Sequence, residues 1–376
     1  MRDAHPVEAG ALAAESAALY TWLLQRAWPL WLDRGVDRAR GGFFETLDLR
    51  THLCAAPFRR LRVVARQIFV FSQAHAAGVP GAAQAVQMGL DFLQNHAAQG
   101  QGGYAWRFDL NHNAIDARRD LYDHAFVLLA FASAAKVAGP AAVRGPALAL
   151  LAWIQAEFAH PCGGYRESLP PCLPRRQNPH MHLLEAALAA HAAFGDPQFL
   201  SAARALVTLF ADRLFHPNSG ALPEFFDETL QPACQGGIFR IEPGHHCEWV
   251  WLLHQAQAAG IADARLPAIS EQLMKFVYIH GKNTDGFVMD AAGSDGRAIS
   301  SAARLWPQTE CLRAEFCRPA GARLASVRAL AAYLRPDGLW HERRFADGRF
   351  SEEAAPASSL YHLTGAILSV KEALRF

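Results

Sequence analysis

The chain has 376 residues, about half of them hydrophobic, and a formal net charge of +1 without a dense run of Lys and Arg, which argues against a nucleic-acid-binding surface. Its seven cysteines are odd in number and form no CxxC pair, which favours free thiols in a reducing compartment over a disulfide framework. The first ten residues make a poor signal peptide and no run of about 18 uninterrupted apolar residues occurs, so we expect a soluble, cytoplasmic protein without a membrane span.

A short glycine-containing motif recurs six times along the chain. The copies read GGFFETLD from Gly41, GGYAWRFD from Gly102, GGYRES from Gly163, SGALPEFFDE from Ser219, DGFVMD from Asp285 and DGLWHE from Asp337. Between the glycines at 42, 103, 164, 220, 286 and 338 the steps are 61, 61, 56, 66 and 52 residues. A repeat of this length predicts a closed ring of six similar units, which we expect to form one domain over residues 1–376.

Segments rich in Ala and Leu separate the glycine motifs, and both residues are strong helix formers. In chain order we expect helices at 12–32, 61–76, 82–96, 121–135, 141–158, 181–193, 200–214, 245–259, 266–279, 322–334 and 359–374. Two helices per unit give an all-α fold, an (α/α)6 barrel or toroid with short β-hairpins or loops at one mouth. The segments from His124 and from Met181 are apolar nearly all round, which predicts buried helices of the inner ring. The alternative is an irregular helical protein with accidental glycine spacing.

A polar residue follows each motif glycine by 18 to 25 residues, early in a helical segment. In chain order these residues are Arg66, His124, His182, His245, Glu310 and His362. We expect them to converge on one mouth of the ring. Histidines such as His245 and His362 can exchange protons near neutral pH, and an arginine can stabilise an oxyanion, so the set predicts proton transfer beside a carbonyl. Nearby aromatic residues offer surfaces for stacking on a sugar ring, namely Tyr122, Trp249, Trp306 and Tyr361.

Several alternatives remain open at this point. A lone buried histidine is more often a core residue, and we favour that interpretation for His124. His180, His182 and Glu185 have a spacing that a metal could use, although alternate residues of a helix point in different directions, so we predict no metal and no cofactor. A glycosidase would need two carboxylates, and the motifs supply Glu45, Glu167, Glu224, Asp227 and Glu342. A non-catalytic sugar-binding toroid is a further alternative.

Six segments in order resemble the N-acylglucosamine 2-epimerase superfamily of (α/α)6-barrel sugar epimerases and isomerases. They are ARQIFVFSQA from Ala65, DLYDHAFVLLA from Asp120, NPHMHLLEA from Asn178, PGHHCEW from Pro243, RLWPQTE from Arg304 and LYHLTGA from Leu360. The first two resemble bacterial mannose isomerases and sulfoquinovose isomerase relatives most.

The resemblance implies that His245 and His362 are the acid/base histidines, with Glu248 as the glutamate that orients His245. It implies a substrate-binding set made of Arg66, Tyr122, Asn178, His182, Glu248, Trp306 and Glu310. The implied reaction interconverts an unphosphorylated, mannose-like aldose and its 2-ketose through a cis-enediol(ate), with 2-epimerisation of N-acylglucosamine or cellobiose as the alternative. We expect a small-molecule sugar as partner, no nucleic acid and no membrane, with a homodimer as one option.

Overall fold

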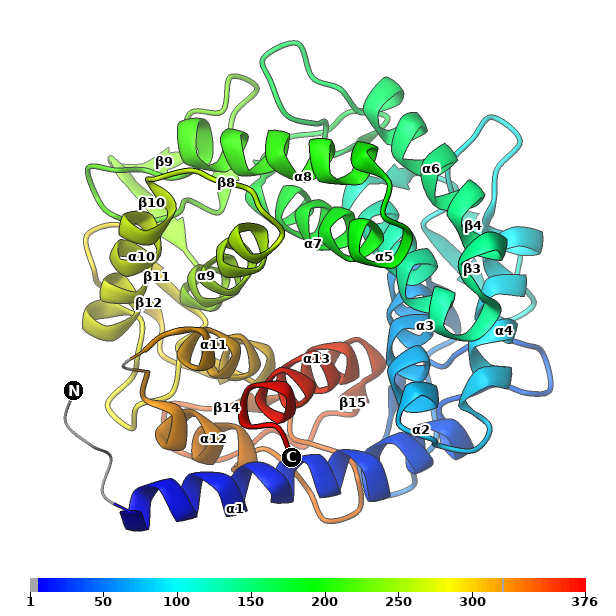
Figure 1. Cartoon of the computed structure of the whole chain (residues 1–376), viewed down its shortest axis with the longest axis horizontal. Coiled ribbons are helices and arrows are strands. Elements are labelled where there is room, and N and C mark those ends of the chain that lie inside the picture. The colour runs from blue at the N-terminus through cyan, green and yellow to red at the C-terminus, as the bar shows by residue number, and fades with distance from the viewer. Residues whose placement is uncertain (1–5, 320) are drawn as a thin grey trace.

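The helices form two concentric rings around a central axis (Figure 1) in the computed structural model, which describes residues 6–319 and 321–376. The inner ring consists of α3 (Leu61–Ala76), α5 (Leu121–Ala138), α7 (Gln177–Phe194), α9 (Pro243–Ala258), α11 (Leu305–Cys317) and α13 (Ala357–Leu374). The outer ring consists of α1 (Pro6–Trp22), α2 (Trp28–Arg34), α4 (Ala82–Phe92), α6 (Pro140–Glu157), α8 (Pro197–Leu209), α10 (Leu266–His280) and α12 (Arg323–Ala331), with π-helical turns at Leu23–Ala27, Leu93–Ala97 and Phe210–Leu214. The predicted (α/α)6 toroid is confirmed.

One inner helix, α11, is absent from the helices expected in advance. Its sequence, LWPQTECLRAEFC, contains few of the Ala and Leu residues that mark the other segments. It nevertheless forms a helix that is buried over most of its length, because tertiary packing outweighs a weak intrinsic helix propensity. The two segments expected to be buried, from His124 and from Met181, lie in α5 and α7 of the inner ring, as predicted.

Short strands join each unit to the next at one end of the toroid. They are β1 (Thr46–Leu47), β2 (Phe58–Arg60), β3 (Arg107–Asp109), β4 (Ala114–Asp116), β5 (Arg119–Asp120), β6 (Ser168–Leu169), β7 (Arg175–Arg176), β8 (Phe225–Phe226), β9 (Cys234–Gln235), β10 (Ile238–Ile241), β11 (Ala291–Gly293), β12 (Ala298–Ser300), β13 (Ala303–Arg304), β14 (Arg343–Arg344) and β15 (Ala355–Pro356). The strand that precedes an inner helix pairs antiparallel with the strand after the next glycine motif, as in β2–β3, β5–β6, β7–β8, β10–β11 and β13–β14. The pair β1–β15 joins the first unit to the last.

A second cross-unit contact caps the inner helices. The first amide of an inner helix donates to a carbonyl in the glycine motif of the next unit, as Leu61 does to Trp106 at 3.0 Å and Leu121 to Glu167 at 3.1 Å. Ala357 of α13 donates to Glu45 of the first unit at 2.8 Å, so the series closes on itself. Helix α9 begins with Pro243 and has no such amide. These bonds satisfy helix amides that would otherwise lack partners.

Each glycine motif is a tight turn between an outer helix and the strands. An antiparallel β-bridge closes each turn, for example Ala98 with Tyr104 and Ala159 with Tyr165. All six motif glycines have positive φ, between 62° and 112°, a region that favours glycine. The six-fold motif of the sequence therefore marks six equivalent turns.

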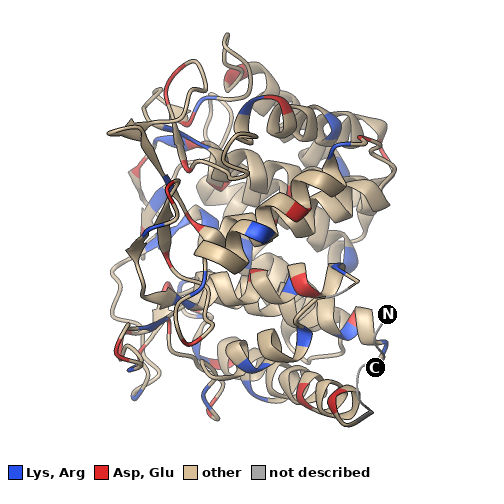
Figure 2. Ribbon diagram, turned by 90° about the vertical axis from the view of Figure 1, so that its left-hand side faces the viewer, with Lys and Arg blue, Asp and Glu red and all other residues tan. Residues whose placement is uncertain are grey.

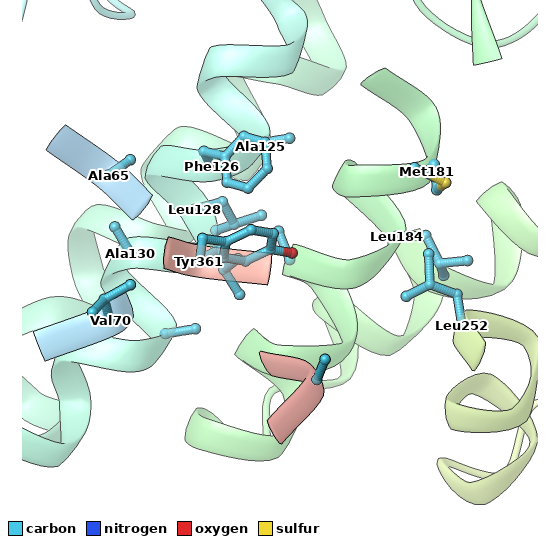
Figure 3. Close-up of a cluster of buried hydrophobic side chains, with 14 of the residues drawn as sticks. Ala65, Val70, Ala125, Phe126, Leu128, Ala130, Met181, Leu184, Leu252 and Tyr361 are labelled. Atoms are coloured by element: carbon cyan, nitrogen blue, oxygen red, sulfur yellow. The ribbon is translucent and has the colours of Figure 1, made fainter. Parts of the chain in front are cut away.

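The toroid has two different ends. The strands gather at one end, and both marked chain ends lie at the other (Figure 2). Charged side chains of both signs are interspersed over the ribbon rather than segregated by sign. The hydrophobic core fills the space around and between the rings, with contributions from α3, α5, α7, α9 and α13 in the cluster of Figure 3.

By length and composition, one helix among the described residues is apolar enough to cross a membrane, namely α5. It stands in the inner ring, and 72% of the apolar window is buried inside the protein. Its apolar character is thus that of a core helix.

The motif turn at Gly103 supplies a stability test. Gly103 has φ of +69°, and a Cβ there would lie 2.3 Å from Trp153 and 2.8 Å from His124. We expect Gly103→Ala to lower the free energy of unfolding by about 2–4 kcal/mol, because backbone strain and overpacking add. Gly145→Ala in α6 is the matched control: a Cβ there meets no atom within 4 Å, so a gain of up to about 1 kcal/mol is expected. Urea unfolding measures the free energy of unfolding of both variants. Equal values for Gly103→Ala and Gly145→Ala would contradict the requirement for glycine in the turn.

Candidate active site

A cavity of about 240 Å³ lies at the strand end of the central axis. Its walls come from the starts of the inner helices and the segments just before them. The lining residues are Arg66, Tyr122, Asn178, His182, Glu242, His245, Glu248, Arg304, Trp306, Glu342, Ser358, Ser359 and His362. The volume is below the roughly 300–1,000 Å³ of sites for drug-sized ligands, and it favours a ligand of about one sugar ring.

The site residues follow a register counted from the start of each inner helix. The sixth residues of the six helices are Arg66, Phe126, His182, Glu248, Glu310 and His362, and all six are buried. The second residues are Arg62, Tyr122, Asn178, Gly244, Trp306 and Ser358. Equivalent positions on six helices face the same axis, and this brings Arg66, His182 and His362 together. His245, the third residue of α9, lines the same cavity. Glu310 does not line the cavity itself, but its carboxylate contacts His362, which does.

His124 does not join the site. It is the fourth residue of α5, and its Nε2 accepts a hydrogen bond from the Tyr104 amide at 2.9 Å. His180 and His246, the fourth residues of α7 and α9, accept in the same way from the motif amides of Tyr165 and Leu222 at 3.0 Å. Burial lowers the pKa of His124 to about 4, so it is neutral and able to accept. Its favoured interpretation as a core residue therefore agrees with its position.

His245 is held by Glu224, and the expectation that Glu248 orients it is wrong. Nδ1 of His245 lies 2.9 Å from both carboxylate oxygens of Glu224, which comes from the fourth glycine motif. Glu248 is on the same helix but points to His182, 3.7 Å away. Burial alone would lower the pKa of His245, but Glu224 and also Glu242 outweigh it, so that pKa lies above its ordinary value.

His362 has a similar partner but the opposite shift. Its Nδ1 lies 2.8 Å from Oε1 of Glu310, whose other oxygen accepts from Arg313 at 3.0 Å. Burial lowers the pKa of His362; Glu310 offsets this only in part, and Arg66 and Arg313 add to the lowering. Near neutral pH His362 is therefore uncharged, with Nδ1–H donated to Glu310 and the Nε2 lone pair free.

Trp306 lies beside both histidines. Its ring centroid is 4.7 Å from that of His245 and 5.9 Å from that of His362. On the other side of His245, the Asn178 amide lies 3.1 Å from Nε2. The contacting atom is the amide nitrogen Nδ2, which donates to Nε2 when His245 carries its proton on Nδ1. Protonation of Nε2 requires the amide to turn its oxygen toward the ring.

Arg66 stands where its positive charge faces the cavity. It donates to the Tyr122 hydroxyl at 2.6 Å and to the Ser358 carbonyl at 3.3 Å, while its guanidinium lies 4.2 Å from the Phe126 ring centroid and 4.9 Å from that of Tyr361. Its Nε has no hydrogen-bond partner among the described residues. The two bonds use two of the five guanidinium N–H groups, so donors remain for a bound oxygen.

His182 and Glu248 belong to a buried cluster behind the cavity. Nδ1 of His182 lies 3.1 Å from Glu185, which also accepts from the Tyr361 hydroxyl. Both oxygens of Glu248 lack a hydrogen-bond partner in the described structure, and burial together with Glu310 and Glu185 raises its pKa well above the ordinary value. Glu248 is therefore protonated at neutral pH and offers a neutral carboxyl to the cavity.

The same cluster contains the groups that a metal ion could use. His182, Glu185 and Glu248 offer ligand atoms within 4.8 Å of one another, as do Glu248, Glu310 and His362. His180, the first histidine of the HxH spacing, is committed to the Tyr165 amide instead. The nearby guanidinium of Arg313 already compensates Glu310 and Glu185, which weakens the electrostatic case for a further cation.

The carboxylates considered for a glycosidase have other partners. Glu45 and Glu167 form ion pairs with Arg60 and Arg176, and Asp227 is exposed in a turn. Only Glu224 and Glu342 of that group reach the site, Glu224 through His245. Sequence reasoning missed the role of Glu224 and the cavity positions of Glu242, Arg304, Ser358 and Ser359. The last four could have been found from their positions in the sequence, because each lies directly before an inner helix or in its first turn.

Comparisons with known proteins place the chain in a family and show proteins that share its fold. The model of a family described as N-acylglucosamine 2-epimerase (GlcNAc 2-epimerase) matches residues 42–366. The chain is 37% identical to a protein of Rhizobium meliloti (strain 1021) named mannose-6-phosphate isomerase, over 96% of this chain and 98% of the relative. Two solved structures share the fold: a D-mannose isomerase (TM-score 0.84, 21% identity, 96% of this chain and 97% of that one) and the cellobiose 2-epimerase of Bacillus thermoamylovorans B4167 (TM-score 0.85, 20% identity, 96% and 99%).

The partner of His245 can be tested without an activity assay. We expect Glu224→Gln to lower the pKa of His245 by about 1–3 pH units, because the carboxylate that favours the imidazolium is removed. Glu248→Gln is the control and should leave that pKa in place. Histidine side-chain NMR over a pH series measures both, and the reverse pattern would restore Glu248 as the orienting residue.

Proposed function

The chain belongs to the N-acylglucosamine 2-epimerase family, and from this premise we propose that it interconverts an unphosphorylated, mannose-like aldose and its 2-ketose. It is an enzyme of the isomerase and 2-epimerase class. The observation that carries the proposal is the pair His245 and His362, which face one cavity with pKa values displaced in opposite directions. Two titratable groups set apart by their surroundings are the arrangement expected for an acid and a base.

His362 is the base of the proposed reaction. Its uncharged imidazole presents Nε2 to the cavity and removes the proton from C2 of the open-chain aldose. Ionised Glu310 then stabilises the imidazolium that forms, because Nδ1–H is already donated to it. His245, whose raised pKa favours the imidazolium, donates a proton to the ring oxygen as the ring opens and accepts the proton that leaves the C1 hydroxyl.

The negative charge of the enediolate is met by Arg66 and by the helix starts. Arg66 lines the cavity, and its guanidinium N–H groups outside the bonds to Tyr122 and Ser358 are candidate donors to the oxygens at C1 and C2. The inner helices also begin around the cavity, and helix N-termini favour negative charge. Return of the carbon-bound proton to C1, with transfer of the O2 proton to O1, gives the ketose.

The alternative is 2-epimerisation through the same enediolate. It requires a proton delivered to the opposite face of C2, and His245, which lines the same cavity as His362, is the candidate donor. Incubation with mannose, lyxose, N-acetylmannosamine or cellobiose in D2O, followed by NMR, distinguishes the outcomes: deuterium at C1 of a ketose supports isomerisation, and deuterium at C2 of an inverted aldose supports epimerisation. A homodimer and a cytoplasmic location stay predictions.

The role of His362 predicts a large loss of turnover on its removal. We expect His362→Ala to lower kcat by roughly 10²–10⁴-fold, because general base catalysis contributes about that much. His254→Ala, at an exposed position of α9, is the control and should keep the wild-type rate. Steady-state kinetics on mannose measures both, and a wild-type rate in the His362 variant would remove it from the mechanism.

The charges in the cavity favour a neutral sugar over a phosphorylated one. Arg304 already binds Glu242 and Asp290, each at 3.0 Å, and Arg66 is the other arginine of the lining. Glu242 and Glu342 also line the cavity and would repel a phosphate dianion. These contacts support the unphosphorylated substrate, although the Rhizobium meliloti relative carries the name of a 6-phosphate isomerase.

This preference has a direct measurement. We expect kcat/KM for mannose to exceed that for mannose 6-phosphate by at least about tenfold, since one unfavourable charge contact of about 1.4 kcal/mol is enough. Glu242→Gln should narrow the difference, and Glu352→Gln, at an exposed position, should not. Faster conversion of the phosphate ester by the wild type would refute the assignment of substrate.

A further inference from the structure

Each of five glycine motifs carries a carboxylate at an equivalent place. They are Glu45, Glu167, Glu224, Asp290 and Glu342, and the second unit has Trp106 there. In three units the carboxylate binds the residue just before its own inner helix, an arginine, through both the backbone amide and the guanidinium. The pairs are Glu45 with Arg60, Glu167 with Arg176, and Asp290 with Arg304. This carboxylate is therefore a structural clamp in three of the six units.

Two units depart from the clamp. In the fourth, the residue before the helix is Glu242, whose backbone amide still donates to Glu224 but which brings no positive charge, and His245 takes the place of the guanidinium. In the sixth, the residue is Pro356, which has neither an amide hydrogen nor a charge. Glu342 forms no ion pair with an arginine within residues 6–319 and 321–376. In the fourth unit, where no arginine is present, the carboxylate of Glu224 therefore binds a histidine of the active site.

Glu342 also reaches the site directly. It lines the cavity together with Ser358 and Ser359, and one of its oxygens accepts from the Ser359 hydroxyl at 2.8 Å. Ser359 is the third residue of α13, so it holds the carboxyl one helical turn ahead of His362. Burial raises the pKa of Glu342 to about 7, Ser359 opposes this, and Glu353 adds to it. Near neutral pH the group both accepts and donates hydrogen bonds.

We propose that Glu342 is a substrate-binding residue that holds one hydroxyl of the sugar, with Ser359 fixing the carboxyl. The inference rests on the proposed function, because it assigns a subsite to the same cavity. A hydroxyl is the matching group, since it donates and accepts as Glu342 does. A phosphate would meet Glu242 and Glu342 together, and an ammonium would meet Arg66 and Arg304.

The test compares Glu342 with a clamp carboxylate. Glu342→Ala should lower kcat/KM for mannose by about 10- to 100-fold, the cost of losing a hydrogen bond to a charged or strongly polar group. Glu342→Gln should lose less and keep wild-type stability. Glu167→Gln is the matched control: it breaks the clamp with Arg176, so its midpoint of urea unfolding should fall while KM and kcat stay unchanged.

Deoxy sugars then identify the contact. With 3-, 4- and 6-deoxymannose as substrates, one analogue should be converted equally by the wild type and Glu342→Ala, because the hydroxyl that the carboxyl holds is missing. Equal losses for every analogue, or wild-type kinetics in both Glu342 variants, would overturn the proposal. Glu342→Gln serves in place of Glu342→Ala if the latter fails to fold.

Calorimetric binding of mannitol, an open-chain polyol, separates this inference from the proposed function. If the wild type converts no aldose but binds mannitol more tightly than Glu342→Gln does, the proposed function fails and the subsite stands. If mannose is converted and the Glu342 variants bind and react as the wild type does, the subsite fails and the function stands. A wild type that binds neither mannose nor mannitol rejects both.

Discussion

The hydrogen bond from the first amide of an inner helix to the next unit's glycine motif is the constraint on which the site depends. It fixes where a helix begins relative to its neighbour, and the adjoining strand pair fixes the direction of approach. Ala357 closes the series on Glu45, and at α9, which begins with Pro243 and lacks this amide, the strand pair β10–β11 joins the two units. Equivalent residues of six helices are thereby held at one level, and a register counted from the helix start has chemical meaning.

The pKa values of His245 and His362 are displaced in opposite directions because different charges lie near their glutamate partners. His245 and His362 each donate Nδ1–H to a glutamate at 2.8–2.9 Å. A second carboxylate, Glu242, adds to the effect of Glu224 on His245, whereas Arg313 compensates Glu310. The imidazolium is favoured in the first case and disfavoured in the second. The charges of Glu242 and Arg313, which lie beyond the direct partners of the histidines, thus decide which histidine is the acid and which the base. Buried charges interact over such distances with little screening.

The ring of helices could be predicted from the sequence because the features that indicate it are local in sequence. Glycine at positive φ must recur at each turn, and Ala- and Leu-rich segments mark most helices. The same locality allowed Arg66, His182, His245 and His362 to be predicted as one cluster. Helix α11 escaped notice because its burial comes from neighbours that are distant in sequence.

The misassigned partner of His245 has a related cause. Glu248 is three residues away along the helix, whereas Glu224 reaches His245 from a motif 21 residues earlier, across a loop whose path the sequence does not state. Offsets counted from the glycines also drew in His124, because loops of different length precede the helices. The fourth helical position, which caps the motif turn, and the sixth, which faces the axis, become distinct only when the helix start is known.

The closed backbone leaves the chemistry to side chains that can be exchanged separately. None of the second and sixth residues of the inner helices donates the amide that closes the ring, so a substitution there alters the cavity without loosening the frame. Two solved proteins with different named activities keep this backbone at TM-scores of 0.84 and 0.85 although only 21% and 20% of residues match this chain. Eight of these twelve positions line the cavity, so specificity can diverge by substitution at one of them at a time on an unchanged backbone.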